Sequence, residues 1–379
     1  MTVSINGTSG IVFNDASTQN TSAFTGGFAF RNRLINSDMR IDQRNAGAVM
    51  TGNDATYSLD RWKNIATQSA KFTVRQTPSA TESGYATRVN AGFSNYLAVT
   101  SSSAYSVLTG DYFCIRQPIE GFNIADLGWG TADAKTITLS FWVYSSLTGT
   151  FGGNLTNGTA ARSYPFSYTV SSANTWTQIS ITIAGDTSGT WSTTNSAGLL
   201  VSFGLGAGAT YSGTANTWAG TYYNQPTSTV SVVGTNGATF YITGVQLEKG
   251  STATSFDYRP YGTELQLCQR YLPYFGGITG QNQSFGQCYS NTTTELRCVI
   301  NFPVPARATP TGLVASTASG FVGQMIASAN LTASAVNWAS IASTTSQLIL
   351  FTVSGATANQ SGAIYNASSG YIYFTGCEL

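Results

Sequence analysis

The sequence predicts an all-β protein whose main body is a jelly roll or a related β-sandwich. One reason is composition: the hydrophobic fraction is an ordinary 42%, whereas the charged fraction is 9%, far below the usual value of roughly one quarter. A second reason is the abundance of Tyr and Phe, which suit a pleated, half-buried sheet, and of Gly, which supplies turns. The third reason is a period of two in short apolar runs, which is typical of strands with one buried face.

The jelly-roll body is predicted over residues 28–262, where short strands alternate with turns. The clearest strands lie at 135–146, 175–185, 198–206 and 238–248. In the first of these, one face would carry Ile137, Leu139, Phe141 and Val143, and the other would carry Thr138, Ser140, Trp142 and Tyr144. Many short strands with Gly- and Asn-rich loops indicate a sandwich rather than alternating strands and helices. Trp62 and Trp142 are expected in its core.

One helix is expected after the body. Thr263 and Gln266 form a capping-box pattern, and Pro273 would end the helix. We therefore assign residues 263–272 to a linking helix and residues 273–379 to a C-terminal β-sandwich tip.

The tip is expected to pack against other copies of itself. Residues 286–305 resemble a hairpin, and no Asp, Glu, Lys or Arg occurs from Ala308 to Cys377. A surface with so few charges would aggregate if it were exposed alone. Neighbouring copies that cover it would make the protein a homo-oligomer.

Residues 1–27 are predicted to form an attachment or stem segment. The apolar run at 11–13 is too short to be buried within the segment itself. Two interpretations stay open: a frayed terminus or a strand added to the next domain, or a stem that intertwines copies or anchors the chain to another protein.

The five cysteines are odd in number and show no CxxC spacing. Free, buried thiols are therefore expected for Cys114, Cys268, Cys288, Cys298 and Cys377. A cross-strand bridge between Cys288 and Cys298 is the alternative.

Charge and hydropathy exclude several partners. A formal net charge of +1 does not provide the basic surface that nucleic acid requires. The start of the sequence has no basic and apolar leader, and no run reaches the roughly 20 apolar residues that span a bilayer. We expect cytoplasmic synthesis without membrane insertion. Because the composition nevertheless resembles that of an extracellular adhesin, the sequence predicts a virion component released by lysis.

Histidine is absent, which excludes Ser-His-Asp and Cys-His nucleophiles and His-bearing zinc sites. Neither a metal nor a cofactor is predicted. Glycoside cleavage by two carboxylates remains, with candidates at Asp111, Glu120, Asp126 and Asp133, and at Glu248 with Asp257. The commoner role of such residues is structural pairing, here Asp60 with Arg61 and Asp257 with Arg259. We therefore expect no catalytic residues and no enzyme.

Aromatic residues in loop-like contexts are the best candidates for ligand binding. Flat rings beside Asn and Gln amides can hold a sugar by its CH groups and hydroxyls. The candidates are Trp129, Trp191, Trp218, Tyr222 and Tyr223 in the body, and Trp338 and Tyr365 in the tip. The alternative for each ring is packing in the core or against another subunit.

Three segments carry a resemblance to a known family: "GTSGIVFNDASTQNTSA", "NRLINSDMRIDQRNAG" with "YSLDRW", and "FYITGVQLEKGSTATSFDYRPYGTELQLCQRYL". Together they resemble bacteriophage tail-fibre, receptor-binding proteins with a carbohydrate-binding-module-like jelly roll. The resemblance implies a jelly-roll sandwich, a homotrimer, and a place in the host-recognition apparatus of a phage tail. It supplies no catalytic residues.

We therefore expect a structural protein of the virion that attaches to a host-surface glycan or receptor, with residues 1–27 contacting other tail proteins. Two other functions stay open. One is a purely structural tail or capsid-decoration protein, which exposed aromatic residues in the tip would disfavour. The other is a carboxylate-dependent polysaccharide depolymerase.

Overall fold

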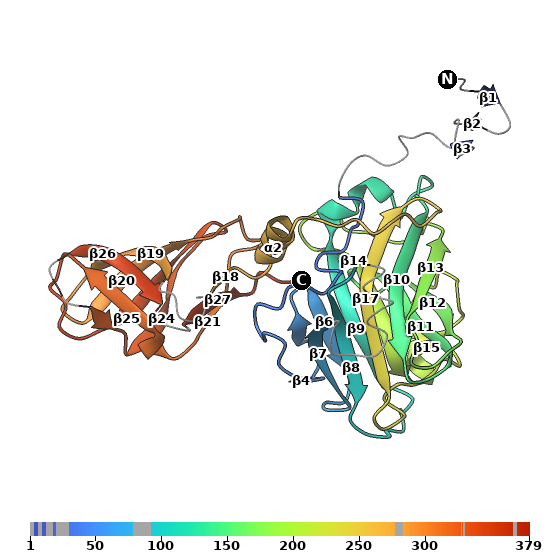
Figure 1. Ribbon diagram of the computed structural model, residues 1–379, viewed down its shortest axis with the longest axis horizontal. Helices are drawn as coiled ribbons and strands as arrows, with labels where there is room; N and C mark the ends of the chain where they lie inside the picture. The colour runs from blue at the N-terminus through green and yellow to red at the C-terminus, as the bar shows by residue number, and fades with distance from the viewer. Residues whose placement is uncertain are drawn as a thin grey trace.

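The computed structural model describes residues 4–6, 10–12, 18–19, 30–78, 92–276, 283–326, 328, 330–366 and 370–379. Within them the chain forms a β body and a smaller β tip joined by one α-helix (Figure 1). The predicted all-β fold is confirmed. Three short antiparallel strands precede the body: β1 (Ser4–Asn6), β2 (Gly10–Val12) and β3 (Thr18–Gln19). The rest of the predicted attachment segment, 1–27, lies outside the described residues.

The body is a sandwich of two six-stranded antiparallel sheets (Figure 1). The first, the β10 sheet, has the order β13 (Thr177–Ile183), β10 (Ile137–Ser145), β17 (Thr239–Lys249), β8 (Asn95–Ser101), β7 (Phe72–Pro78) and β4 (Met50–Thr51). The second, the β9 sheet, has the order β12 (Ser163–Val170), β11 (Gly149–Asn157), β14 (Ala197–Ala207), β9 (Tyr112–Glu120), β6 (Trp62–Ala66) and β5 (Tyr57–Leu59). Short 3₁₀ helices η2 (Gly121–Asn123), η3 (Ala125–Leu127) and η4 (Ala209–Tyr211) lie in its loops.

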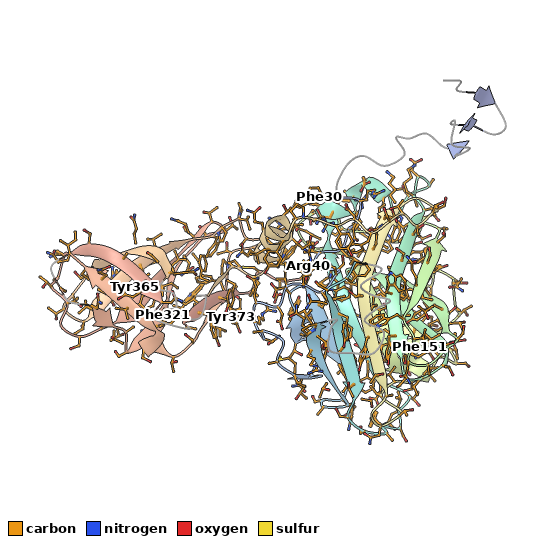
Figure 2. All side chains as sticks on the ribbon, viewed as in Figure 1. Phe30, Arg40, Phe151, Phe321, Tyr365 and Tyr373 are labelled. Atoms are coloured by element: carbon orange, nitrogen blue, oxygen red, sulfur yellow. A yellow bond between two sulfur atoms is a disulfide. The ribbon has the colours of Figure 1, made fainter. Side chains whose placement is uncertain are left out.

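The core lies between the two sheets, where alternate side chains of each strand meet. Phe113 of β9 and Phe203 of β14 are fully buried there, as is Phe151 (Figure 2). The predicted core position of Trp62 is confirmed. The predicted core position of Trp142 is wrong. Its strand neighbours Phe141 and Val143 face the core, so Trp142 lies on the outer face of the β10 sheet, where it is half-buried.

Strand β10 is buried on both faces, whereas its alternation predicts one buried face. The outer-face residues Thr138 and Ser140 are both buried. A neighbouring cluster of large rings on the same outer face contains Tyr96, Tyr144 and Tyr241. Burial of the second face therefore comes from side chains of other strands, which the sequence of β10 alone does not reveal.

The linking helix α2 (Tyr261–Gln269) begins and ends earlier than predicted. Pro260 stands at its N-cap and no side chain caps the helix, so the capping box at Thr263 does not form. Pro260 cannot donate a backbone hydrogen bond, and such a residue is tolerated at a helix start. Just after α2, Arg270 donates to both oxygens of Glu120 in β9, at 2.6 and 3.0 Å. This pair fixes the helix to the body.

The tip packs two antiparallel sheets around one core. Its seven-stranded sheet has the order β23 (Leu331–Thr332), β22 (Phe321–Met325), β26 (Ser361–Asn366), β19 (Gln283–Ser290), β20 (Glu295–Asn301), β25 (Ser346–Thr352) and β24 (Ala335–Ala342). Its three-stranded sheet has the order β18 (Tyr274–Gly276), β27 (Tyr371–Thr375) and β21 (Gly312–Ala315), and η5 (Ala318–Gly320) precedes β22. The predicted hairpin at 286–305 is confirmed as β19 and β20.

Cys288 and Cys298 are direct partners across this hairpin and form a disulfide. The expectation of free thiols is therefore wrong for these two residues, because the hairpin register places them opposite each other. Cys114, Cys268 and Cys377 are free and buried, as predicted.

The end of the chain returns to the body. Glu378 forms a partly buried ion pair with Arg44, and the Tyr57 hydroxyl donates to the main-chain oxygen of Leu379 at 2.7 Å. Arg307 donates to the carbonyls of Glu378 and Asn195 at 2.7 and 3.0 Å. The tip is thus joined to the body by its last residues as well as by α2.

Candidate functional site

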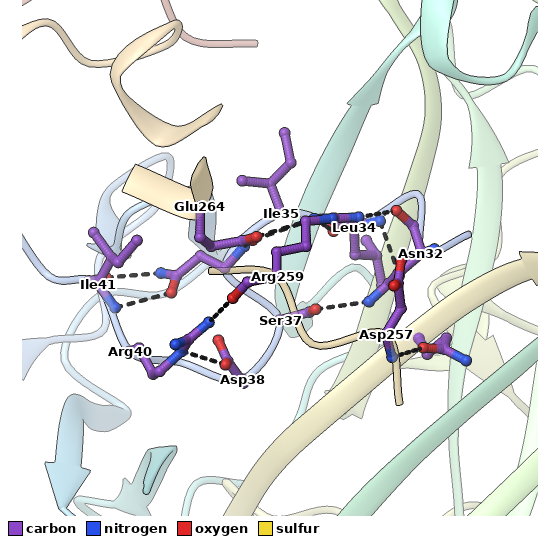
Figure 3. A network of polar contacts seen from close by, with 12 residues as sticks. Asn32, Leu34, Ile35, Ser37, Asp38, Arg40, Ile41, Asp257, Arg259 and Glu264 are labelled. Carbon is purple, nitrogen blue, oxygen red and sulfur yellow. Dashed lines mark hydrogen bonds and ion pairs between the residues drawn. The ribbon is translucent and has the colours of Figure 1, made fainter. Parts of the chain in front are cut away.

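Two segments that carry the family resemblance meet in a buried polar network (Figure 3). Arg259 forms an ion pair with Glu264 at 3.1 Å and donates to the carbonyls of Asn32 and Leu34. Glu264 accepts from the backbone of Asn36. These residues connect the start of the body to its end, so their role is to close the sandwich.

This network encloses no space for a ligand. The crevice between its members is too small even for a water molecule; its lining consists of Ser37, Asp38, Arg40, Phe256, Asp257, Arg259 and Glu264. Burial raises the pKa of Asp38, an effect that the nearby Arg40 opposes. The proposed pairing of Asp257 with Arg259 is wrong in detail, since Arg259 pairs with Glu264 and Asp257 accepts from the backbone of Asn32.

The proposed pairing of Asp60 with Arg61 is also wrong in detail. Asp60 accepts from Gln43, whereas Arg61 donates to the Pro118 carbonyl and lies 3.5 Å from the ring centre of Tyr271. The residues are structural, as expected, but their partners are Gln43 in a turn, Pro118 in β9 and Tyr271 just after α2.

The other acidic candidates have structural partners. Burial opposes ionisation of Glu120, but hydrogen bonds from Arg270 and Tyr271 outweigh it and lower the pKa. Asp126 has a lowered pKa because Arg33 donates to it. Asp111 has a lowered pKa because hydrogen bonds, led by that of the Tyr105 hydroxyl, outweigh its desolvation. A glycosidase acid needs a raised pKa instead.

Glu248 accepts from Thr254 and Gln246 within the body, and Asp133 is an exposed loop residue.

Among the described residues, no group of three or more Cys, Asp or Glu side chains could hold a metal ion. Within the same part of the chain, no helix is long and apolar enough to cross a membrane.

Three of the tryptophans singled out in the sequence form one cluster at an end of the body. The ring centres of Trp129 and Trp191 are 4.7 Å apart, and Trp218 lies 5.4 and 5.6 Å from them. Trp129 and Trp191 are only 6% and 7% exposed. Each indole N–H of the three donates to a backbone carbonyl. This arrangement favours the packing role for Trp129 and Trp191.

The two tip candidates lie apart from this cluster. Trp338 is half-buried and packs against Phe374 with ring centres 6.2 Å apart. Tyr365 is half-buried on β26 (Figure 2). The structure brings neither ring together with another aromatic candidate of the sequence.

A different set of rings gathers on the outer face of the β9 sheet. Tyr112 begins β9, Tyr211 ends η4, and Tyr222 lies in the loop between β15 (Ser212–Gly213) and β16 (Gln225–Pro226). The centre of the Tyr112 ring is 4.5 Å from that of Tyr211 and 5.5 Å from that of Tyr222. All three are half-buried, so each offers part of its surface to solvent.

Arg116 lies among these rings because the pleat of β9 places it on the same face as Tyr112. Its Nε donates to Ser202 Oγ at 2.9 Å and its Nη2 to the Tyr222 hydroxyl at 2.6 Å. The Tyr222 hydroxyl in turn donates to Asn224. The guanidinium is therefore held in place. Its Nη1 makes no hydrogen bond within the described residues and is not fully buried.

Arg116 belongs to a row of residues that are paired across adjacent strands of the β9 sheet. Across the outer face, the row runs Pro165, Asn154, Ser202, Arg116, Lys63 and Tyr57. Lys63 is half-buried, and its Nζ lies 5.7 Å from the centre of the Tyr57 ring. We call Tyr112, Arg116, Tyr211, Tyr222 and Lys63 the tyrosine–arginine patch.

Residues 209–227, named here the covering segment, close the other half of this face. The Tyr223 carbonyl accepts from Asn154 at 2.6 Å, and the Thr221 carbonyl accepts from Ser163 at 2.6 Å. The Tyr223 ring lies over Gly213, where a Cβ would collide with it. Tyr223 therefore positions the covering segment, which contributes Tyr211 and Tyr222 to the patch.

Sequence reasoning identified Tyr222 but missed Tyr112, Arg116, Tyr211 and Lys63. In β9 the alternation of Phe113 and Ile115 with Tyr112 and Arg116 was readable as a strand with a polar, aromatic outer face. Nothing in the local sequence indicates that β6 and the covering segment meet there.

A second opening lies between the domains and is mainly apolar. It has a volume of about 380 Å³ and is lined by Phe30, Thr263, Gln266, Leu267, Arg270, Val304 and Pro305. It lacks the combination of clustered rings and unpaired donors found in the tyrosine–arginine patch.

No family model matches the chain, and no curated protein matches its sequence. Solved structures similar to it include the enzymatically active domain of tailspike protein 4 of bacteriophage CBA120, which is 12% identical with a TM-score of 0.31. That match covers 58% of this chain and 22% of that chain, so the chain spans about a fifth of the tailspike structure.

Two further structures are named for sugar binding. A putative sugar binding protein of Bacteroides thetaiotaomicron is 10% identical, with a TM-score of 0.31 and coverage of 58% of this chain and 100% of that chain. A family 11 carbohydrate-binding module of a Clostridium thermocellum cellulase is 12% identical, with a TM-score of 0.25 and coverage of 54% and 98%. At these scores and identities, the likeness says nothing about what this chain binds.

Proposed function

We propose that this protein is a non-enzymatic subunit of a phage tail that attaches to a host-surface glycan through the tyrosine–arginine patch. The observation that carries the proposal is the contact of the partly exposed rings of Tyr112, Tyr211 and Tyr222 around Arg116 on the outer face of the β9 sheet. The place on a phage tail is supported by the sequence resemblance of three segments, two of which are joined in the buried polar network.

The chemistry of the patch suits a sugar. Partly exposed rings provide apolar faces for sugar CH groups, and a fixed guanidinium nitrogen can donate to a hydroxyl or ring oxygen. Because the Ser202 and Tyr222 hydroxyls already hold Arg116, little conformational entropy is lost when a ligand binds.

Weak binding at one patch is sufficient for attachment. Several patches on one oligomer raise the avidity above the single-site affinity by roughly 10² to 10⁴. We infer a homotrimer, with the N-terminal segment contacting other tail proteins. Light scattering after size exclusion tests this directly: a stable monomer at micromolar concentration would remove the multivalent part of the proposal.

A purely structural tail or capsid-decoration protein is the main alternative. Tyr289 in the tip is 44% exposed, and an exposed tip aromatic disfavours that alternative. A depolymerase is disfavoured by the structural partners of Glu120, Asp126 and Asp111. Incubation with a bound polysaccharide tests it: shortened chains would support an enzyme.

The test of the proposed function is binding of the full chain to an array of bacterial surface glycans. We expect Tyr112→Ala combined with Tyr222→Ala to abolish binding that the native protein shows. Tyr261→Ala is the matched control, because this ring is 54% exposed on α2, away from the patch. If no glycan binds the native protein, or the double variant binds like the control, the proposed function is wrong.

A further inference from the structure

Lys63 and Arg116 are direct partners on the adjacent strands β6 and β9. Their side chains leave the sheet on the same outer face, and like charges placed directly opposite each other destabilise a sheet. Neither forms an ion pair with a carboxylate within the described residues.

Eight other basic side chains of the described chain form ion pairs with carboxylates: Arg33, Arg40, Arg44, Arg162, Lys249, Arg259, Arg270 and Arg297. Arg61 and Arg307 donate to backbone carbonyls. Arg31, Lys71 and Lys135 also form no ion pair within the described residues. Lys63 and Arg116 differ from these three because they are direct partners on adjacent strands.

The carboxylates that act on the patch from a distance have other partners. Asp54, whose charge influences Tyr112, accepts from the backbone N–H of Ala66. Glu378, whose charge is influenced by Lys63, is paired with Arg44. Neither forms an ion pair with Lys63 or Arg116 within the described residues.

We propose that Lys63 and Arg116 bind the anionic group of an acidic glycan, a carboxylate or a phosphate, while Tyr112, Tyr211 and Tyr222 pack against the adjoining sugar rings. This inference rests on the proposed function and names the class of glycan that the patch selects. The open Nη1 of Arg116 provides a directed donor, and Lys63 adds a second positive charge on the adjacent strand.

The arrangement favours an anion for a physical reason. Arg116 is partly buried and already satisfied on one side, so an oxyanion at its open side would meet a cation with little water around it. A hydrogen bond from the charged guanidinium is strengthened with either kind of sugar. An anionic group adds a direct attraction to the charges of Arg116 and Lys63 that a neutral sugar lacks.

The test uses the full chain with polygalacturonate for carboxylate, phosphomannan for phosphate and dextran as the neutral polymer, alongside the glycan array. We expect at least one acidic polymer to bind, with an affinity that falls as NaCl rises, and dextran to bind far more weakly. The polymer that binds identifies which oxyanion the patch accepts.

Variants separate the two cations from the fold. Lys63→Gln removes no hydrogen bond of the Lys63 side chain within the described residues, and we expect it to weaken acidic-polymer binding about tenfold, as the loss of one charged contact does. Arg116→Gln should weaken it further, and Arg116→Lys should restore part of the loss. Lys135→Gln is the matched control, because Lys135 is an exposed lysine in the loop after η3. This variant should bind like the native chain.

The outcomes distinguish this inference from the proposed function. Equal binding of dextran and the acidic polymers, or unchanged acidic binding by both Lys63→Gln and Arg116→Gln, would overturn the inference and leave glycan attachment standing. Failure of the native chain to bind any polymer or array glycan would overturn both.

Discussion

The guanidinium of Arg116 and the hydroxyl of Tyr222 are joined by a 2.6 Å hydrogen bond, although 106 positions separate them in the sequence. This contact ties the covering segment to strand β9. It also connects the candidate site to the fold, because Tyr222 both orients Arg116 and donates to Asn224, whose own side chain donates to the Phe113 carbonyl.

Tyr222→Phe tests this contact while keeping the ring. We expect a loss of about 1 kcal/mol in the free energy of unfolding and a several-fold weaker affinity for the bound glycan, since one hydrogen bond to a charged group is removed. Thermal unfolding and glycan titration measure the two effects. Tyr261→Phe is the control, and equal glycan affinities for the two variants would show that the hydroxyl of Tyr222 has no part in binding.

Asp60→Asn tests a buried carboxyl. Burial raises the pKa of Asp60 to about 7, although hydrogen bonds from Gln43 and the charge of Arg44 oppose this shift. A raised carboxyl pKa means that the folded state binds the proton more tightly than the unfolded state. The native protein should therefore lose stability, on the order of 2–4 kcal/mol from this group, as pH rises from about 4 to about 7.

The measurement is urea unfolding of the native chain and of Asp60→Asn between pH 4.5 and pH 7.5, spanning the range that the shift defines. We expect a smaller loss of stability with rising pH in the variant. Parallel pH profiles for the two proteins would mean that Asp60 ionises normally in the folded state.

Glu378→Ala tests the return of the chain to the body. Arg44 would remain partly buried without its partner, and leaving such a donor unsatisfied costs about 1–3 kcal/mol. We expect the tip to move relative to the body, with faster proteolysis near α2 and a larger radius in X-ray scattering. Glu295→Ala is the control, because its pair with Arg297 is within the tip and partly exposed. Compact scattering from Glu378→Ala would contradict a role for this pair in the junction.

Cys288→Ser tests the disulfide of the tip. A bridge that closes a short hairpin loop, with a sequence separation of 10, stabilises by roughly 2–3 kcal/mol. We expect the variant to have a lower unfolding temperature for the tip. Reductant should lower the unfolding temperature of the native protein by the same amount and should not change that of the variant. Cys114→Ser, at a free cysteine, should leave the response to reductant unchanged.

The sequence predicted those parts of the fold that depend on local pattern. The alternation in β10, β13, β14 and β17 identifies strands because each strand's period is independent of its partners. The β19–β20 hairpin was predictable for the same reason, since its two strands are adjacent in sequence. The sequence permits the pairing of Cys288 with Cys298 only as an alternative, because this pairing depends on the exact register of the hairpin.

The candidate site was mostly not predictable, because its residues meet through pairing of distant strands. Lys63 reaches Arg116 through the β6–β9 register, and Tyr222 reaches it through the covering segment. The loop positions of Trp129 and Trp191 indicated exposure, yet these loops fold inward and bury both rings. A residue's place in a loop therefore did not determine whether its ring faced solvent.

The most direct test of glycan attachment is a crystal structure of the full chain with an oligosaccharide cut from a polymer that it binds. We predict that sugar rings lie against Tyr112, Tyr211 and Tyr222, with a sugar oxygen within hydrogen-bonding distance of Arg116 Nη1. An oligosaccharide bound at the tip or at the opening beside α2, with the tyrosine–arginine patch empty, would contradict the account.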